Sequence, residues 1–287
     1  MEARWKEIQQ ESRKGRPKSN LEENFSSYRA VSRMVCNYAI PKEYKETSKD
    51  AEDDNEVGDG DLPILDQLRN KASQFFSLDG LKEYSPKMLK IYETLKASLG
   101  EAPYRKQLVY SNYERLEGVG LFGAILEQNG FQRYKIIKQN GVWIEDPDLK
   151  PGVPAYAMFT GQVSIDERDL MRQIFNQRPE QNFPPSLKDS IKEPGRLCVF
   201  MITKAGAEGI NLMNVRHVHI MESHWNPALI DQAIGRAIRL CSHATLPMDQ
   251  RTVKVNQYMT VFNKDQLTTA EGNNIIPIRR QDMVLKR

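Results

Sequence analysis

Apolar runs of strand length alternate with segments of helical periodicity over most of the chain. Strand-like runs cover residues 108–111, 131–137, 155–159, 197–202, 215–221 and 253–262. Segments with apolar positions at helical spacing lie at 86–99, 119–126, 164–177 and 227–239. This alternation predicts an α/β fold, a parallel sheet with helices on both faces. Ligands of such sheets bind at the carboxyl ends of the strands.

Several polar residues mark where helices should begin. Ser85 and Asn226 each precede a proline, so we expect both to be N-caps, with the proline in the first turn. Ser164 with Glu167 has the spacing of a capping box. We expect ordered structure to begin at Ser85.

Polar and charged residues dominate the N-terminal part, with a basic stretch at 13–18 and an acidic run at 49–61. We therefore predict a largely irregular lead-in with an acidic linker over residues 1–80. A single domain is expected over 81–265, and a basic tail over 266–287.

A small-residue loop follows the apolar run 197–202. Gly206 and Gly209 allow a ligand to approach the backbone closely, while Thr203, Lys204 and Asn211 add a hydroxyl, a cation and an amide. The loop is not a Walker A loop, because the sequence contains no Gly-Lys-Ser or Gly-Lys-Thr.

Two arginines and a glutamine follow at helical spacing. Placed on a helix, Gln232, Arg236 and Arg239 share one face, and Ile230, Ile234 and Ile238 form a separate apolar stripe. Guanidinium groups suit the spread charge of a phosphoryl group. A solvated helix face would explain the arginines alone, but the neighbouring loops favour a phosphate site.

Bulk composition favours no particular partner. The 287 residues contain 41 Lys and Arg against 38 Asp and Glu, a net charge of +3, so any nucleic-acid site must come from local patches. Three widely spaced cysteines fit reduced thiols, and no apolar run reaches transmembrane length, so we expect a soluble intracellular protein. The histidines and Cys241 lack zinc spacing, and we expect no metal site in the chain.

The motifs together resemble the second RecA-like lobe of superfamily 2 helicases of the Swi/Snf-like branch. The matching segments occur in family order: 106–111, Phe159-Thr160-Gly161 followed by Arg168 and Phe175-Asn176, 203–212, 223–227 and 232–239. Two departures, Glu208 within the glycine loop and the ending Arg239-Leu240-Cys241-Ser242-His243, resemble helicases of large nucleocytoplasmic DNA viruses, including poxvirus-type nucleoside triphosphatases. Residues 28–41 are similar to the segment that enters the second lobe of those viral proteins.

The resemblance implies a role for each matching residue. Arg236 and Arg239 would be catalytic, neutralising charge as the γ-phosphoryl group of ATP leaves. The nucleotide, held with Mg²⁺ only together with a first lobe, would contact Gln232, Gly209, Asn211, Arg236 and Arg239. Nucleic acid, DNA or RNA, would contact Ser111, Gly161, Thr203, Lys204, Gly206 and Trp225.

The phosphate-gripping loop and the magnesium carboxylate belong to the first lobe in this family. The chain is therefore not expected to hydrolyse ATP alone, and its first lobe would come from a longer polypeptide or another chain. The alternative is a catalytically inert nucleic-acid-binding or docking module. The arginines weigh against the alternative, because a binder has no need of them.

Overall fold

A parallel sheet forms the centre of the computed structural model. The structure describes residues 30–41, 43–44, 61–99, 106–114, 116–160, 163–192, 196–203, 210–224 and 226–261, and residues from Met34 onward belong to one compact unit. Six strands pair in the order β2-β5-β6-β1-β7-β8, each parallel to its neighbours. Their bounds are Lys106–Ser111 (β1), Gln132–Arg133 (β2), Ala155–Phe159 (β5), Leu197–Thr203 (β6), Val215–Ile220 (β7) and Lys254–Gln257 (β8).

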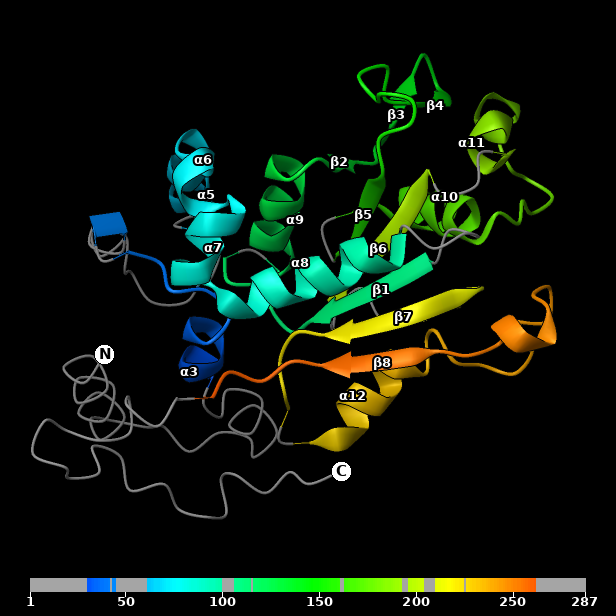
Figure 1. The fold of residues 1–287 in the computed structure, drawn as a ribbon. Helices are drawn as coiled ribbons and strands as arrows, with labels where there is room; N and C mark the ends of the chain where they lie inside the picture. The colour runs from blue at the N-terminus through cyan, green and yellow to red at the C-terminus, as the bar shows by residue number, and fades with distance from the viewer. Residues whose placement is uncertain are drawn as a thin grey trace, which may run out of the picture. The chain divides into compact units, whose positions relative to one another are not determined.

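Helices lie between β1 and β2, between β5 and β6, and between β7 and β8, as Figure 1 shows. The α-helices are α3 (Ala30–Val35), α5 (Asp61–Asn70), α6 (Ala72–Phe75), α7 (Leu78–Tyr84), α8 (Pro86–Leu99), α9 (Val119–Gln128), α10 (Ile165–Asn176), α11 (Lys188–Lys192) and α12 (Pro227–Ile234). Two 3₁₀ helices, η2 (Pro185–Leu187) and η3 (Met248–Gln250), lie in connections. No helix within the described residues is long and apolar enough to cross a membrane.

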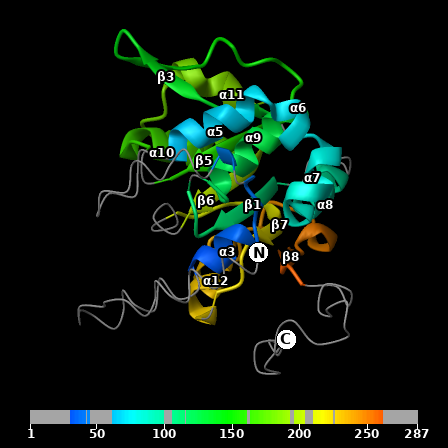
Figure 2. The same ribbon diagram turned by 90° about the vertical axis from the view of Figure 1, so that its left-hand side faces the viewer.

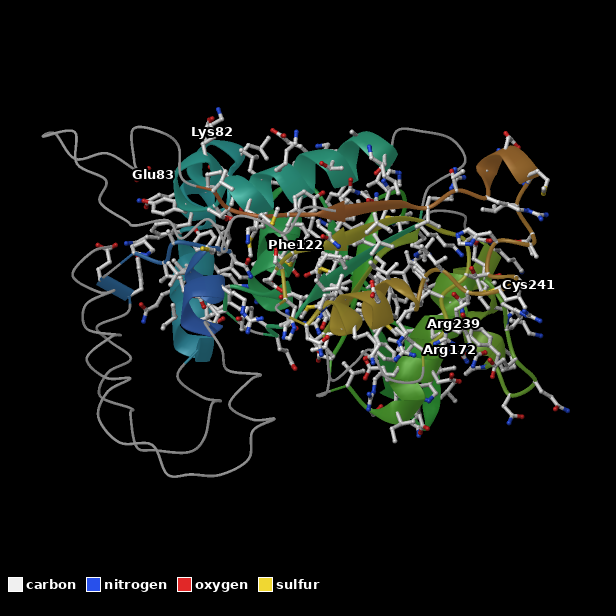
Figure 3. The ribbon with its side chains drawn as sticks, turned by 90° about the horizontal axis from the view of Figure 1, so that it is seen from below. Lys82, Glu83, Phe122, Arg172, Arg239 and Cys241 are labelled. Carbon is white, nitrogen blue, oxygen red and sulfur yellow. The ribbon has the colours of Figure 1, made fainter. Side chains whose placement is uncertain are left out.

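The two faces of the sheet bury two separate apolar cores. Because side chains alternate along a strand, Val109 of β1 packs with α5 to α9, whereas Leu108 packs with α10 and α12. Met201 and Phe200 of β6 divide in the same way. Figure 3 shows α8 on one side of the sheet and α10 and α12 on the other. The predicted α/β fold with helices on both faces is confirmed.

The helix starts expected from sequence are present. Ser85 Oγ accepts a hydrogen bond from Met88 N (3.0 Å) at the start of α8. Ser164 Oγ accepts from Glu167 N, and Asn226 Oδ1 accepts from Ala228 N (3.0 Å). Each cap satisfies an amide that the helix itself cannot pair.

The expected strand 131–137 is wrong as a single element. Its start forms β2, whereas its end forms β3 (Ile136–Gln139), which pairs antiparallel with β4 (Val142–Glu145) in a separate two-stranded sheet. Asn140 and Gly141 join these strands with φ of 51° and 80°. An Asn-Gly pair with both φ values positive is the common two-residue hairpin turn, so this signal was present in the sequence.

Ordered structure begins before Ser85, contrary to the expectation from sequence. Helices α5, α6 and α7 precede it, and Figure 2 shows them grouped with α8 and α9. Leu68, Phe75 and Leu81 of these helices are almost completely buried in the first core. Apolar residues are few in this segment, but they lie at helical spacing, as in Ile64, Leu65 and Leu68. The polar composition of the segment therefore concealed an amphipathic helix. The domain boundary at residue 81 stays a prediction.

Candidate functional site

The carboxyl ends of three central strands bring polar groups together. Ser111 and Thr203, the last residues of β1 and β6, are register partners. Glu222 lies two residues beyond the end of β7, and Met221 N donates to Tyr110 O (3.0 Å), which holds the end of β7 against β1. Two hydroxyls and a carboxylate therefore share the edge at which ligands of parallel sheets bind.

Glu222 is a buried carboxylate, only 1% exposed. Its Oε1 accepts hydrogen bonds from Asn37 Nδ2 (2.5 Å) and Ser111 Oγ (2.6 Å), and its Oε2 accepts from Asn112 N (2.9 Å) and Asn112 Nδ2 (3.3 Å). Burial raises the pKa of Glu222, and the hydrogen bonds from Ser111, Asn112 and Asn37 oppose that rise. No role for this carboxylate was predicted from sequence, where its signal is its place directly after the apolar run 215–221.

The two strand-end hydroxyls are differently engaged. Ser111 is fully buried, and its hydroxyl donates to Glu222 and accepts from Tyr113 N (3.1 Å), so it faces the protein. Thr203 is 3% exposed, and its Oγ1 has no hydrogen-bond partner among the described residues. A buried hydroxyl without a partner is costly. Thr203 is thus the better placed of the two for an added ligand, and both phosphate contacts stay predictions.

Five of the expected site residues lie outside the described residues: Gly161, Lys204, Gly206, Gly209 and Trp225. In the sequence they follow β5, β6 and β7. Their expected contacts therefore stay predictions.

The expected helix through Arg239 is wrong. Helix α12 ends at Ile234, with Gly235 as its C-cap, and the chain continues in tight turns in which Arg236 N donates to Ala233 O (3.1 Å). Glycine is unfavourable inside a helix, and the Arg236 carbonyl is captured by Leu212 N (3.1 Å) instead of a following turn. Ile238 is 46% exposed, so the predicted apolar stripe is also broken.

The arginine segment, residues 235–239, presents its two guanidinium groups differently. Arg236 is half-buried, and its Nε is buried with no hydrogen-bond partner among the described residues. Arg239 is exposed, and its Nε donates to Gly235 O (3.1 Å). Figure 3 places Arg239 on the α10 and α12 side of the sheet. Gln232 is exposed on α12.

Asn211 lies beside the arginine segment, because the next residue, Leu212, pairs with the carbonyl of Arg236. Its own carbonyl accepts from Asn176 Nδ2 (2.9 Å), and Asn176 Oδ1 accepts from Met213 N (2.8 Å). Asn176, at the end of α10, therefore clamps the chain where the loop after β6 returns to β7. A role for this amide was not expected from sequence.

The histidines serve as hydrogen-bonding groups within the fold. His219 Nε2 lies 2.8 Å from Gln107 Oε1, and His243 Nε2 lies 2.6 Å from Val215 O. Searching the described residues for three or more His, Cys, Asp or Glu side chains able to hold a metal ion finds no such group.

Part of the chain matches a known protein family. Residues 155–241 match the helicase conserved C-terminal domain. This stretch runs from β5 through the arginine segment, so it contains Thr203, Asn211, Gln232, Arg236 and Arg239.

Viral proteins are among the curated relatives. A candidate ATP-dependent RNA helicase of Acanthamoeba polyphaga mimivirus is 28% identical over 256 residues, covering 89% of this chain and 36% of the relative. A termination factor NPH-I homologue of African swine fever virus is 26% identical over 223 residues, covering 69% of this chain and 29% of the relative. The chain thus spans about a third of the length of these relatives.

Solved structures with a similar arrangement include two ATPase cores. The C-terminal part of the Fun30 ATPase domain matches with a TM-score of 0.43 at 16% identity, covering 79% of this chain and 62% of that one. The Sulfolobus solfataricus SWI2/SNF2 ATPase core, solved in complex with double-stranded DNA, matches with a TM-score of 0.36 at 20% identity, covering 77% and 38%.

Proposed function

Because residues 155–241 match the helicase conserved C-terminal domain, we propose that this chain is the second motor lobe of a nucleic-acid-dependent ATPase, a helicase or translocase. In this proposal a first lobe holds the triphosphate and Mg²⁺, and the present chain completes the site. The arginine segment carries the proposal, because it lies within the matched residues and holds both candidate catalytic arginines.

Arg236 and Arg239 are the proposed catalytic residues. The buried Nε of Arg236 lacks a partner within the described part of the chain, and the exposed Arg239 guanidinium is anchored at one nitrogen only, so both retain donors for an anion. An arginine that reaches a transferring phosphoryl group stabilises the charge that develops on its oxygens. Gln232, Gly209 and Asn211 would complete the nucleotide contacts.

Nucleic acid is proposed to lie at the carboxyl ends of the strands. Thr203 has a buried hydroxyl without a partner among the described residues. In the sequence, Gly161 follows β5, Lys204 and Gly206 follow β6, and Trp225 follows β7. Hydroxyl groups, backbone amides and a lysine favour contacts to phosphate, which position a strand without reading its sequence. We propose DNA as the partner, and the mimivirus relative, named as an RNA helicase, makes RNA the alternative.

The proposal is tested by supplying a first lobe. The chain alone should release no phosphate from ATP above background, whereas a first lobe, fused or added in trans, should restore nucleic-acid-stimulated turnover. Arg236→Ala and Arg239→Ala should each lower turnover by about a thousandfold and leave nucleic-acid affinity nearly unchanged.

Arg251→Ala is the matched control. Arg251 is exposed in the loop before β8 and donates to the carbonyls of Leu246 and Ala244. Its substitution removes an arginine that has no proposed role in turnover. Its turnover should stay near wild type. Binding of nucleic acid without turnover, whichever first lobe is supplied, would favour the inert docking module. Equal loss of nucleic-acid affinity in the Arg236 and Arg239 variants would instead assign the pair to the phosphate backbone.

A further inference from the structure

Asn37 attaches an N-terminal segment, residues 36–40, to the strand-end site. Besides donating to Glu222, the Asn37 amide donates to Glu117 O (2.7 Å), and its Oδ1 accepts from Lys87 Nζ (2.9 Å). Its backbone carbonyl accepts from Ser85 Oγ. The side-chain amide, the Oδ1 atom and the backbone carbonyl of this buried residue are therefore all hydrogen-bonded to distant parts of the chain.

The same segment is bound to the helical layer. Tyr38 OH donates to Phe75 O (3.1 Å), and Ala39 N donates to Tyr84 O (2.8 Å). Tyr38 also stacks on Tyr84, with ring centroids 6.2 Å apart. A shift of the 36–40 segment would consequently break several contacts at once, and the Glu222 contact would be among them.

Glu222 accepts hydrogen bonds from two segments that lie far from it and from each other in sequence. Its four bonds come from Asn37, Ser111 and Asn112, and each partner acts as a donor. An ionised carboxylate has only acceptor sites, so it suits this ring of donors. A glutamine of the same size would turn its NH₂ group toward at least one donor, so the requirement is chemical as well as steric.

We propose that Glu222 is a positioning residue that couples the 36–40 segment to the loops following β1 and β7. Its carboxylate holds Asn112 in the first loop, and it begins the second loop, which leads to Asn226 at the cap of α12 and then to the arginine segment. Movement of the N-terminal segment would thereby be transmitted to the strand-end loops. The consequence for nucleic-acid binding rests on the function proposed above, whereas the coupling itself does not.

The coupling is tested in the full chain by amide hydrogen exchange at Asn112, whose N–H binds Glu222. Asn37→Ala removes one donor, and Glu222→Gln replaces an acceptor with a donor. In each variant the Asn112 amide should exchange at least about tenfold faster than in wild type. This increase is counted after any change in the global unfolding free energy of the variant has been allowed for.

A swapped pair distinguishes coupling from simple damage. In Asn37→Asp with Glu222→Gln, the new amide can donate to the new carboxylate, Lys87 remains beside that carboxylate, and the Gln oxygen still accepts from Asn112 N. The two single substitutions, Asn37→Asp and Glu222→Gln, each lower the logarithm of the protection factor of the Asn112 amide. The double variant should recover about half or more of the sum of these two losses. Asn129→Ala is the control, because Asn129 Nδ2 also donates to two carbonyls, of Phe76 (2.7 Å) and Ile125 (2.8 Å), in α9 and its surroundings.

The outcomes separate the inference from the proposed function. Faster exchange at Asn112 in the single variants, recovery in the double variant and no change in Asn129→Ala support the coupling. Exchange that rises uniformly along the chain overturns it, as does a double variant no better than the summed effects of Asn37→Asp and Glu222→Gln measured separately. The same variants are titrated with a fluorescent single strand. Altered exchange with unaltered affinity would keep the coupling and overturn the placement of nucleic acid at the strand ends.

Discussion

The Nζ atom of Lys106 lies over the ring of Phe175, 5.3 Å from the ring centroid. Lys106 is 9% exposed at the start of β1, and its Nζ has no hydrogen-bond partner among the described residues. Burial lowers the pKa of this amine to about 7. The attraction of an ammonium group to an aromatic face offsets only part of the cost of removing the charge from water.

Lys106→Met should therefore stabilise the protein at neutral pH. The folded-state pKa is lower than the unfolded value, so the lysine's contribution to stability is complete only above the unfolded pKa of 10.5 and is lost as pH falls through about 7. Urea denaturation should show the variant more stable by about 2–4 kcal/mol at pH 7, with the gain shrinking toward pH 9.5.

Lys90→Met supplies the comparison for Lys106→Met. Lys90 is an exposed lysine of α8 that pairs with Glu93 on its own helix, so its loss should change stability little at either pH. A gain from Lys106→Met that is the same at pH 7 and pH 9.5 would show that packing, and not the buried charge, is responsible.

A buried histidine should make the fold sensitive to acid. Gln107 Nε2 donates to Leu95 O (2.9 Å), so its Oε1 accepts the proton of His219 Nε2, and His219 Nδ1 accepts from Tyr258 OH (2.9 Å). Burial, and secondarily the nearby His217 and Lys254, lower the pKa of His219 to about 3. This neutral ring contributes stability above pH 6.5 that is lost as pH falls toward 3.

The acid sensitivity is measured by comparing wild type with His219→Gln. Glutamine can donate to Gln107 and accept from Tyr258 but takes up no proton. Between pH 6.5 and 4, wild type should lose about 1.4 kcal/mol of unfolding free energy per pH unit more than the variant. If the unfolding free energies of wild type and variant instead change equally with pH, His219 takes up no additional proton on unfolding, and its pKa is not lowered in the folded protein.

The sequence predicted the sheet because buried parallel strands are recognisable without tertiary information. The runs at β1, β6 and β7 are apolar or alternating and are bounded by polar loops, and all three strands are buried along their length. The caps Ser164 and Asn226 were predictable for the same reason, since an N-cap acts on amides two or three residues away.

The contacts of the site depended on tertiary structure. Asn37 and Glu222 are 185 positions apart and meet only because the 36–40 segment lies at the ends of β1 and β7. Helical periodicity alone predicted that α12 would continue through Arg239. Instead, a distant donor, Leu212 N, forms a hydrogen bond with the Arg236 carbonyl just beyond the end of the helix. Local sequence patterns identified Arg236 and Arg239 as candidates but could not predict their conformation or their exposure.

Gly118 should tolerate no side chain. It is the N-cap of α9, directly after the strand-end loop that contains Asn112, and a Cβ built on it would lie 2.1 Å from Tyr113 O. Its φ of −131° suits any residue, so the conflict is purely steric. Gly118→Ala should lower the unfolding free energy by about 2–4 kcal/mol in thermal or urea denaturation.

Gly130→Ala is the control for Gly118→Ala. Gly130 has open space around the missing Cβ but a φ of +93°, so the same substitution should cost only about 1 kcal/mol of backbone strain. A Gly118→Ala variant as stable as Gly130→Ala would mean that the loop of residues 112–117 yields easily and does not depend on this close contact.

Nucleic-acid binding should be weak, indifferent to sequence and dependent on salt, because backbone contacts displace counterions from phosphates. Affinity for a fluorescent single strand and for a duplex would be titrated at several salt concentrations. Lys204→Ala should flatten the slope of log affinity against log salt by about one unit, as expected for one lost phosphate contact. The control is Lys82→Ala, because Lys82 is exposed on α7, pairs with Asp79 and lies away from Arg239 in Figure 3. An unchanged slope for Lys204→Ala, or equal changes for both lysines, would remove the loop after β6 from the nucleic-acid site and favour the docking module.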